Sequence, residues 1–434
     1  MRMRNKIVMK QESKPALTPK LRFPEFRDAE GWTEKPLGEV SDILMCKRIF
    51  AEETNPNKGV PFFKIGTLGG VPDAFISGEK FEDYKSRYNF PRKSEVLITC
   101  SGTVGKCLPY DGKDAYFQDS NIVWIDNPTL EVSNEFLLML LSDVNWGRLN
   151  STTITRIYGP DLRGLAIRFP EDKHEQQKIA DCLTSLDELI TAQSQKLDAL
   201  KTHKKGLMQQ LFPREGETIP RLRFPEFQDV RGWAKKPFSA LCEIKHGYAF
   251  EGEFFSDAGE YVLLTPGSFY EEGGYRDRGD KQKYYTGEIP QDYVLKEGDM
   301  LVAMTEQAAG LLGSPLLVPE SDKFLHNQRL GLVVPKPDAP WTNEFFFHVF
   351  NSQSVRKAIH ASAAGAKVRH TSPIKIGEVV VTVPASLPEQ QRIATCLTAL
   401  DDLITAHSAK LSALKTHKKG LMQQLFPSPQ EVEA

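Results

Sequence analysis

Two stretches of this chain are nearly identical in sequence. Glu175 to Pro213 reads EQQKIADCLTSLDELITAQSQKLDALKTHKKGLMQQLFP, and Glu389 to Pro427 reads EQQRIATCLTALDDLITAHSAKLSALKTHKKGLMQQLFP. They are offset by 214 residues, and 32 of their 39 positions are identical. A second repeat opens each half of the chain, with LRFPEFRDAEGW from Leu21 and LRFPEFQDVRGW from Leu222. The two motifs recur in the same order, so the chain contains one module twice.

Each repeated stretch predicts a long helix. Asp172 and Ser386, each three residues before a glutamate, fit helix N-caps, and a proline is expected to end each helix. The spacing of the core positions alternates between four and three, which predicts a coiled-coil seam. The predicted seam consists of Ile179, Leu183, Leu186, Ile190, Gln193, Leu197, Leu200, Lys204, Leu207 and Leu211 in the first copy, and Ile393, Leu397, Leu400, Ile404, His407, Leu411, Leu414, Lys418, Leu421 and Leu425 in the second.

The simplest partner for each helix is the other one, so two equivalent helices predict an antiparallel pair. About 40 residues at about 1.5 Å each give a rod of about 60 Å, with the globular domains expected at opposite ends. Gln193 and His407 interrupt the seam at equivalent positions. They either fix the register of the pair or form a solvated gap. The basic THKKG ends, from Thr202 and Thr416, either complement the helix C-termini or contact a partner subunit or a phosphate backbone.

The stretches between the repeats match poorly but share a skeleton of short strand-like runs separated by turn residues. These runs are FFKIGTL, EVLITC and NIVWI in the first half, and YVLLTP, DMLVAM and LGLVV in the second. Short helices are predicted at Asn134 to Asp143 and at Asn343 to Phe350. The predicted fold class is α+β, with two globular domains of mainly antiparallel sheet separated by two long helices that form an antiparallel coiled coil.

These elements divide the chain into seven parts. The predicted boundaries are a flexible tail at 1–18, a first globular domain at 19–170, a first spacer helix at 171–213, a linker at 214–219, a second globular domain at 220–384, a second spacer helix at 385–427 and a C-terminal tail at 428–434. The offset between the halves grows from 201 to 214, so the second domain has about 13 additional residues. We expect readout that is unique to the second domain to lie among them.

Composition narrows the class of protein. A net charge of -2 is mild evidence against a free-standing DNA-binding protein, although local basic faces remain compatible with it. The six cysteines lack CxxC spacing, which argues against a zinc site. The longest apolar run near the start, Ile7 to Met9, is too short for a signal peptide or a membrane span. We therefore expect a cytoplasmic protein without a membrane segment or a metal.

The sequence contains no Walker A, GxGxxG, HExxH or GxSxG motif. The nearest glycine-rich piece, Ser101 to Lys106, reads SGTVGK and lacks the full P-loop spacing. A polar turn on a surface explains it better than a nucleotide site. The chain is therefore expected to recognise a ligand without catalysing a reaction, with no catalytic residue and no cofactor of its own.

The pattern resembles the specificity subunit of type I restriction-modification enzymes. The resemblance rests on the LRFPEF openings, the EQQKIA and EQQRIA helix starts, and the lead-in segments Ile154 to Pro170 and Val368 to Pro384. The double proline usual before EQ is reduced to single prolines at Pro170, Pro384 and Pro388. The resemblance covers essentially the whole chain.

The resemblance implies a function for each part. Each globular domain would be a target-recognition domain that reads one half of a split, asymmetric site in double-stranded DNA. The helices would set the spacing and bind two methyltransferase (M) subunits, which use S-adenosylmethionine to methylate adenine. Motor-nuclease (R) subunits, which use ATP and magnesium, would complete the restriction enzyme. A 60 Å rod corresponds to at most about 17 base pairs, which suits two short half-sites with an unread gap.

Base readout needs hydrogen-bonding side chains on loops that reach a groove, with basic residues on the phosphates. An insertion-like stretch also combines basic residues with Tyr275, Tyr284 and Tyr285, which could stack or grip the backbone. The predicted DNA contacts are Lys64, Thr67, Thr99, Ser101, Thr103, Lys106, Arg156 and Tyr158 in the first domain, and Thr265, Ser268, Tyr270, Arg276, Arg278, Lys281, Lys283, Thr305, Gln307, Lys367, Arg369 and His370 in the second.

Two other functions stay open. A stand-alone adenine methyltransferase would need an Asn/Asp-Pro-Pro-Tyr/Phe motif, and neither Asn55 to Asn57 nor Asp126 to Thr129 matches it. A scaffold could instead use the coil to space two protein-binding domains. Sequence-dependent binding to a split DNA site would separate the specificity subunit from both.

Overall fold

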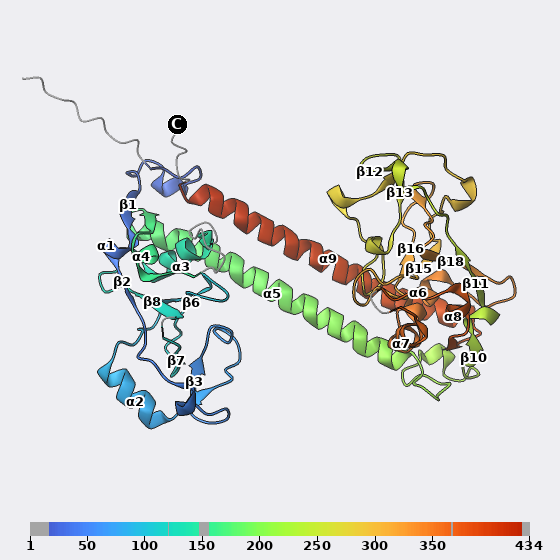
Figure 1. Cartoon of the computed structure of the whole chain (residues 1–434), viewed down its shortest axis with the longest axis horizontal. Helices are drawn as coiled ribbons and strands as arrows, with labels where there is room; N and C mark the ends of the chain where they lie inside the picture. The colour runs from blue at the N-terminus through green and yellow to red at the C-terminus, as the bar shows by residue number, and fades with distance from the viewer. Residues whose placement is uncertain (1–16, 120, 147–155, 366–367, 428–434) are drawn as a thin grey trace, which may run out of the picture. The chain divides into compact units, whose positions relative to one another are not determined.

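The computed structural model describes residues 17–119, 121–146, 156–365 and 368–427 (Figure 1). The chain divides into two compact units. The first takes the residues up to Gln193 together with those from Lys410 onward, and the second takes Ser194–Ala409. Each unit therefore contains one globular domain and a part of each long helix, α5 (Lys173–Leu211) and α9 (Leu387–Leu425). The predicted boundaries instead made each long helix a separate part of the chain, at 171–213 and 385–427.

The first unit contains a main sheet of order β2-β8-β5-β6, a smaller sheet of order β4-β3-β7 and a ribbon of β1 and β9. Its strands are β1 (Thr33–Pro36), β2 (Asp42–Leu44), β3 (Val60–Phe63), β4 (Phe75–Ile76), β5 (Val96–Thr99), β6 (Cys107–Pro109), β7 (Tyr116–Phe117), β8 (Ile122–Asp126) and β9 (Ala166–Phe169). Its shorter helices are α1 (Leu37–Val40), α2 (Gly78–Arg87), α3 (Asn134–Asp143) and α4 (Gly159–Arg163). Figure 1 shows α2 beside β3 within this unit.

The second unit repeats this plan with sheets of order β11-β18-β15-β16 and β12-β14-β13-β17 and a ribbon of β10 and β19. Its strands are β10 (Ala234–Pro237), β11 (Cys242–His246), β12 (Phe255–Ser256), β13 (Tyr261–Leu263), β14 (Tyr284–Tyr285), β15 (Met300–Ala303), β16 (Pro315–Leu317), β17 (Phe324–Leu325), β18 (Leu330–Pro335) and β19 (Val380–Val383). Its shorter helices are α6 (Asn343–Phe350), α7 (Gln353–Ser362) and α8 (Pro373–Gly377).

Strand pairing confirms the α+β class with mainly antiparallel sheets. Among the described strands, only β3 with β7 and β13 with β17 pair in parallel. The helices predicted at Asn134 to Asp143 and at Asn343 to Phe350 are α3 and α6, and both begin and end at the predicted residues. Helices α2 and α7 were not predicted.

The central strand of each main sheet is buried on both faces, because successive side chains of a strand point to opposite sides. In β5, Val96 and Ile98 pack in the core around α3, and Leu97 packs in the core below the smaller sheet. In β15, Met300 and Val302 pack around α6, and Leu301 packs on the opposite side. A continuous apolar run such as VLIT or MLVA is typical of such a strand.

The two long helices run antiparallel within each unit. In the first unit, Ile179 and Leu183 of α5 share a core with Met422 and Leu425 of α9. In the second, Leu211 of α5 shares a core with residues from the start of α9, including Leu397. Every predicted seam position is buried or half-buried, including Gln193 and His407.

Equivalent ion pairs join the helices in both units. In the first unit the Lys418 Nζ lies 2.6 Å from an Asp187 oxygen, and in the second the Lys204 Nζ lies 2.5 Å from an Asp401 oxygen. The two lysines are polar seam positions in the basic THKKG ends. An ionic partner on the opposite helix explains these two charges more directly than the helix C-terminus does, and it favours one register of the antiparallel pair.

The repeated opening and the repeated helix start form one buried cluster in each unit. We call Arg22, Trp32 and Glu175 the first Arg–Trp–Glu cluster. The Arg22 guanidinium donates to both Glu175 oxygens at 2.7 Å, and the Trp32 Nε1 donates to the same carboxylate at 3.4 Å. The Arg22 and Glu175 side chains are only 6% and 1% exposed. Because a buried charge needs a partner, replacing either motif would leave the charge of the other buried and unpaired.

The second Arg–Trp–Glu cluster consists of Arg223, Trp233 and Glu389. Its guanidinium donates to the Glu389 oxygens at 2.7 and 2.8 Å, and the Trp233 Nε1 donates at 3.0 Å. The N-cap prediction identified the helix starts, because Asp172 accepts from the His174 amide and Ser386 from the Glu389 amide. The glutamates, however, bind the opening motif and not the N-cap backbone.

The glutamine that follows each of these glutamates ties the long helix to the domain. Gln176 donates to the Pro170 carbonyl at the end of β9 and accepts from the amide of Ser133, the N-cap of α3. Gln390 donates to the Pro384 carbonyl at the end of β19 and accepts from the Thr342 amide before α6. The EQQ motif thus positions strand, short helix and long helix together.

The tail and the linker contribute to this framework at their inner ends. The Trp32 amide donates to the Leu17 carbonyl at 2.6 Å, and the Trp233 amide donates to the Thr218 carbonyl at 2.7 Å. The flexible tail predicted over 1–18 therefore extended too far, because Leu17 pairs with Trp32. The remaining predicted tail residues, 1–16 and 428–434, lie outside the described residues.

Candidate nucleic-acid interface

Three predicted segments of the first domain lie together. They are the loop after β3, the turn between β5 and β6, and the approach to α4. The Lys106 Nζ of the turn donates to the Leu68 carbonyl of the loop at 2.5 Å. The Ile157 amide of the approach segment donates to the Cys100 carbonyl of the turn at 2.8 Å. Residues distant in sequence therefore form one polar surface.

The exposed side chains of this surface are Thr103, Lys106 and Tyr158. Arg156 is half-buried, and its guanidinium lies 5.7 Å from the Tyr158 ring centroid. Lys64 forms an ion pair with Asp73 at 3.0 Å. This arrangement offers cations, an aromatic face and a hydroxyl for contact with a polyanion.

Three other predicted contacts in this domain have structural roles. The Thr99 side chain is fully buried; its hydroxyl donates to the Thr103 carbonyl and accepts from the Lys106 amide at 3.0 Å. Thr67 accepts from the Lys64 amide at 3.0 Å and so closes its own loop. The Ser101 hydroxyl donates to Asn121 at 2.8 Å. The prediction for Thr99 is corrected, because burial removes this side chain from any external ligand.

The equivalent segments of the second domain also lie together. The Thr371 amide donates to the Met304 carbonyl and the Glu306 amide to the Arg369 carbonyl, both at 2.9 Å. The Ser314 hydroxyl donates to the Tyr270 carbonyl at 2.7 Å. The predicted contacts that are exposed here are Tyr270, Arg276, Arg278, Lys281, Lys283, Gln307, Arg369 and His370.

Several of these exposed cations interact with neighbours. Arg276 lies 5.9 Å from the Tyr270 ring centroid, which resembles the predicted mix of basic and aromatic groups. Lys283 forms an ion pair with Asp257 at 2.5 Å. The paired ammonium remains exposed, and a surface ion pair of this kind is weak enough to be exchanged for a phosphate.

The burial of other second-domain residues corrects their predicted roles. Ser268 is 1% exposed, and its hydroxyl accepts from the Thr265 amide at 3.2 Å, which closes the same kind of loop as Thr67 does. Thr305 is 8% exposed and lies 3.4 Å from the His370 ring. Tyr284 and Tyr285 form β14, where Tyr285 belongs to an aromatic core. Lys367 lies outside the described residues.

The additional residues of the second domain are not one insertion. The connection after β3 runs over 64–74, and its counterpart after β13 runs over 264–283. The turn over 100–106 becomes 304–314, and the stretch over 144–165 becomes 351–379. The first domain is the longer one over 77–95, which contains α2, against 286–299, and its α3 is also longer than α6. Three longer connections, partly offset by shorter segments, therefore produce the difference in offset.

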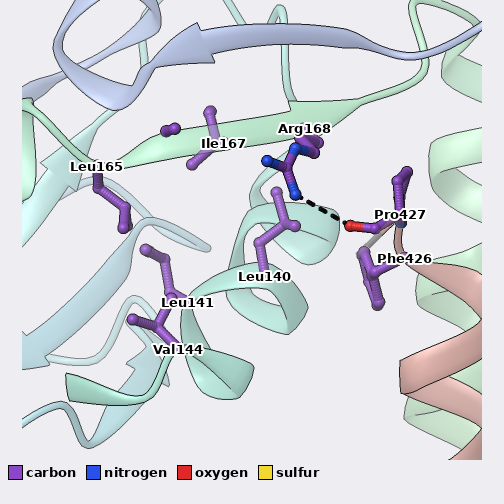
Figure 2. Close-up of a pocket in the computed structure, with 9 residues that line it drawn as sticks. Leu140, Leu141, Val144, Leu165, Ile167, Arg168, Phe426 and Pro427 are labelled. Carbon is purple, nitrogen blue, oxygen red and sulfur yellow. Dashed lines mark hydrogen bonds between the residues drawn. The ribbon is translucent and has the colours of Figure 1, made fainter. Parts of the chain in front are cut away.

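A small pocket in the first unit belongs to the framework. It measures about 100 Å³ and is lined by α3, β9 and the end of α9, with Leu140, Ile167 and Phe426 among its walls (Figure 2). Its one charged side chain, Arg168, donates to the Pro427 carbonyl at 3.2 Å and to Glu34 at 2.6 Å. Apolar walls and an occupied arginine indicate packing at the helix end and not a ligand site.

The described part of the chain contains no cluster of three or more histidine, cysteine or acidic side chains suited to a metal. In the same residues, no helix has the length and apolar character needed to cross a membrane. Burial raises the pKa of the Cys100 thiol to about 11, against the influence of nearby Arg156, so this cysteine of the turn is protonated at neutral pH.

The Arg–Trp–Glu clusters, the glutamines Gln176 and Gln390, and several residues around α7 were not predicted from the sequence. A signal for the first two was present, because all of them lie inside the repeated motifs. Residues kept identical in two otherwise divergent halves are candidates for one shared contact. The residues around α7 carried no such signal.

Comparison with known proteins gives a consistent result. A family model for the type I restriction modification DNA specificity domain matches residues 29–202 and 231–416. A protein of Haemophilus influenzae named as type I restriction enzyme specificity subunit S.HindORF215P is 42% identical over 156 residues, which is 36% of this chain and 40% of that protein. The type I restriction enzyme MjaVIII specificity subunit of Methanocaldococcus jannaschii is 22% identical over 256 residues, or 58% of this chain and 59% of that protein.

The chain thus spans less than two thirds of the length of these two relatives in the alignments. A crystal structure of the type I restriction-modification system S subunit from M. genitalium has a TM-score of 0.62 at 17% identity. That match covers 95% of this chain and all of the other, and it supports the fold. Because the family model matches both halves, this chain belongs to the family of type I restriction-modification specificity subunits and carries two copies of the DNA specificity domain.

Proposed function

We propose that this chain selects the DNA sequence on which a type I restriction-modification complex acts. Each globular domain binds one half of a split, asymmetric site in double-stranded DNA. The observation that carries this proposal is the contrast between a shared framework and two different sets of polar loops. An identical framework with different loops suits two half-sites of different sequence.

The long helices set the spacing between the half-sites and hold two methyltransferase subunits. Their near-identity supports two equivalent docking surfaces, one on each copy of the repeat. Catalysis belongs to the partners: methyltransferase subunits supply S-adenosylmethionine chemistry, and motor-nuclease subunits supply ATP and magnesium chemistry. This chain contributes recognition and acts in the cytoplasm.

Cations around the candidate interface are expected to dominate affinity through phosphate contacts. Lys106 in the first domain and Arg276, Arg278 and Lys281 in the second are exposed and suited to this role. Polar groups on the same loops, such as Thr103 and Gln307, are suited to base edges. Affinity should therefore fall with salt, while sequence preference should depend on the polar groups.

The proposal is tested by expressing the chain with its methyltransferase partner in a host that lacks methyladenine, followed by mapping of the modified bases. We expect a two-part motif with an unread gap. Replacing residues 220–384 with the second domain of another specificity subunit should change one half of the motif and leave the other intact. Methylation without a two-part motif, or a swap that changes both halves, would contradict the proposal.

A further inference from the structure

The three longer connections of the second domain meet at one side chain, Arg356 of α7. Its Nη2 donates to the Glu271 carbonyl at 3.2 Å and to the Gly310 carbonyl. Glu271 lies in the connection over 264–283, Gly310 in the turn over 304–314, and Arg356 itself in the stretch over 351–379. Asn351 adds a hydrogen bond to the Glu272 carbonyl. Hydrogen bonds from Arg356 and Asn351 therefore join the three connections that are longer here than in the first domain.

A hollow of about 390 Å³ lies at this junction. Basic side chains dominate its lining, together with small or apolar groups. The lining residues are Gly310, Leu312, Arg356, Lys357, His360, Ala361 and Arg369. A cavity with this charge is suited to an anionic ligand or to the electronegative edge of a base.

One arginine of the hollow is held in a fixed direction. The Arg369 Nη1 lies 2.6 Å from the His360 Nδ1, and the His360 Nε2 lies 3.2 Å from a Glu306 oxygen. An arginine can only donate, so Nδ1 must be the acceptor and Nε2 must carry the proton that Glu306 accepts. Glu306 also accepts from the Gly310 amide at 3.1 Å. The chain Glu306–His360–Arg369 therefore begins on the turn and ends on an exposed guanidinium.

Arg369 retains donors for a ligand. His360 occupies one of the five N–H groups of the guanidinium, and no ion pair engages Arg369 within the described residues. A bidentate arginine contact with the O6 and N7 atoms of guanine is the commonest specific contact in a major groove, and it requires a well-oriented planar fork. A side chain oriented by supporting hydrogen bonds meets that requirement better than a mobile one.

We propose that Arg369 reads a base with two adjacent acceptors, as guanine presents, in the half-site of the second domain, and that His360 and Glu306 are positioning residues that aim it. Arg356 holds the three connections that carry this group. The inference rests on the proposed function, because it assumes that the second domain contacts DNA. It adds a named specificity determinant and a reason why the first domain, with its shorter connections, would read a different sequence.

The test uses the complex of this chain with its methyltransferase subunit. Duplexes with the second half-site randomised and the first held constant are selected by binding and sequenced. A bidentate contact is worth about 1–3 kcal/mol of discrimination, or about 5-fold to 150-fold. We expect Arg369→Lys to lose that preference at one base position while the salt dependence of affinity stays the same, since the charge is kept.

His360→Ala should reduce the same preference, and His360→Gln should restore part of it, because its amide accepts from one side and donates to the other. Lys357→Ala is the matched control on α7: we expect the exposed Lys357 to contact a phosphate, so its removal should lower affinity for all sequences and reduce the salt slope by about 1. Retained preference at the other base positions of the second half-site verifies that the second domain of each variant is folded. A full sequence preference in Arg369→Lys, or a uniform loss across all sequences, would overturn the inference.

The two proposals fail in different ways. If the wild-type complex enriches no sequence at the randomised half-site, the proposed function fails. If the wild-type complex enriches a sequence and Arg369→Lys enriches the same one equally well, only the role of Arg369 fails. If His360→Ala and Glu306→Gln leave the preference intact while Arg369→Lys removes it, Arg369 reads the base but is not positioned by this chain of hydrogen bonds.

Discussion

Glu389→Gln tests whether the second Arg–Trp–Glu cluster holds the repeated motifs together. Gln has the same shape as Glu but no charge, so the substitution leaves the Arg223 guanidinium buried beside a neutral group. The Arg223 and Glu389 side chains are 6% and 1% exposed. Breaking one side of a buried ion pair costs about 3–5 kcal/mol. We expect about 3 kcal/mol, because Arg223 keeps its hydrogen bond to the Val230 carbonyl at 2.7 Å.

Native-state hydrogen exchange is the suitable assay, since a chain with two units need not unfold in one step. The Trp233 amide donates to the Thr218 carbonyl, so its exchange reports opening of the second unit. A loss of 3 kcal/mol accelerates exchange about 150-fold. The Trp32 amide, in the equivalent hydrogen bond of the first unit, serves as the internal control and should keep its protection.

Glu226→Gln provides the matched substitution at an exposed pair. Glu226 lies 3.3 Å from Arg392, and the two side chains are 48% and 51% exposed. An exposed pair contributes about 0–1 kcal/mol. Replacing Arg223 and Glu389 together by methionine should cost less than Glu389→Gln alone, because no charge is left buried. Equal effects of Glu389→Gln and Glu226→Gln on the Trp233 amide would show that the buried cluster does not hold the second unit together.

Further predictions concern stability at other positions. Lys204→Asp should lower the opening free energy of the second unit by about 1 kcal/mol, measured by exchange of the Trp233 amide, and adding Asp401→Lys should recover most of it, because the reversed pair restores the attraction. Burial lowers the pKa of His326 to about 4, so stability present above pH 6.5 should be lost as pH falls towards 4, by about 1.4 kcal/mol per pH unit; in thermal melts His326→Gln should flatten this dependence, and an unchanged slope would contradict it. Gly105→Ala should lower the free energy of unfolding of the first unit by about 2 kcal/mol and therefore lower the melting temperature. Gly105 has φ 78°, and a Cβ at this position would lie 1.9 Å from the Trp146 ring.

The long helices and their pairing were predictable because a heptad pattern depends on local spacing alone. Leu183 and Leu397 recur at intervals that a helix places on one face, and both are fully buried. The short helices α3 and α6 were predictable for the same reason, with Ser133 supplying the N-cap of α3. Local rules of this kind do not depend on contacts with distant segments.

The candidate interface was predictable only in part. Polar loops between strands can be located from turn residues, but the burial of Thr99 depends on the backbone of its own turn, and that of Ser268 on a 3₁₀ turn. The Glu306–His360–Arg369 chain joins three segments through side chains. Nothing local in the sequence marks His360 as the acceptor for Arg369, since the contact depends on how α7 packs against the turn.

Binding of the purified complex, chain plus methyltransferase subunit, to a duplex that carries the split site found by methyladenine mapping shows directly whether this chain selects the DNA sequence. We expect preferential binding of this duplex over a random one, a steep decrease in affinity with salt, and loss of the preference when base pairs are added between the half-sites. Equal binding to target and random duplexes at every salt concentration would show that the chain does not select DNA sequence.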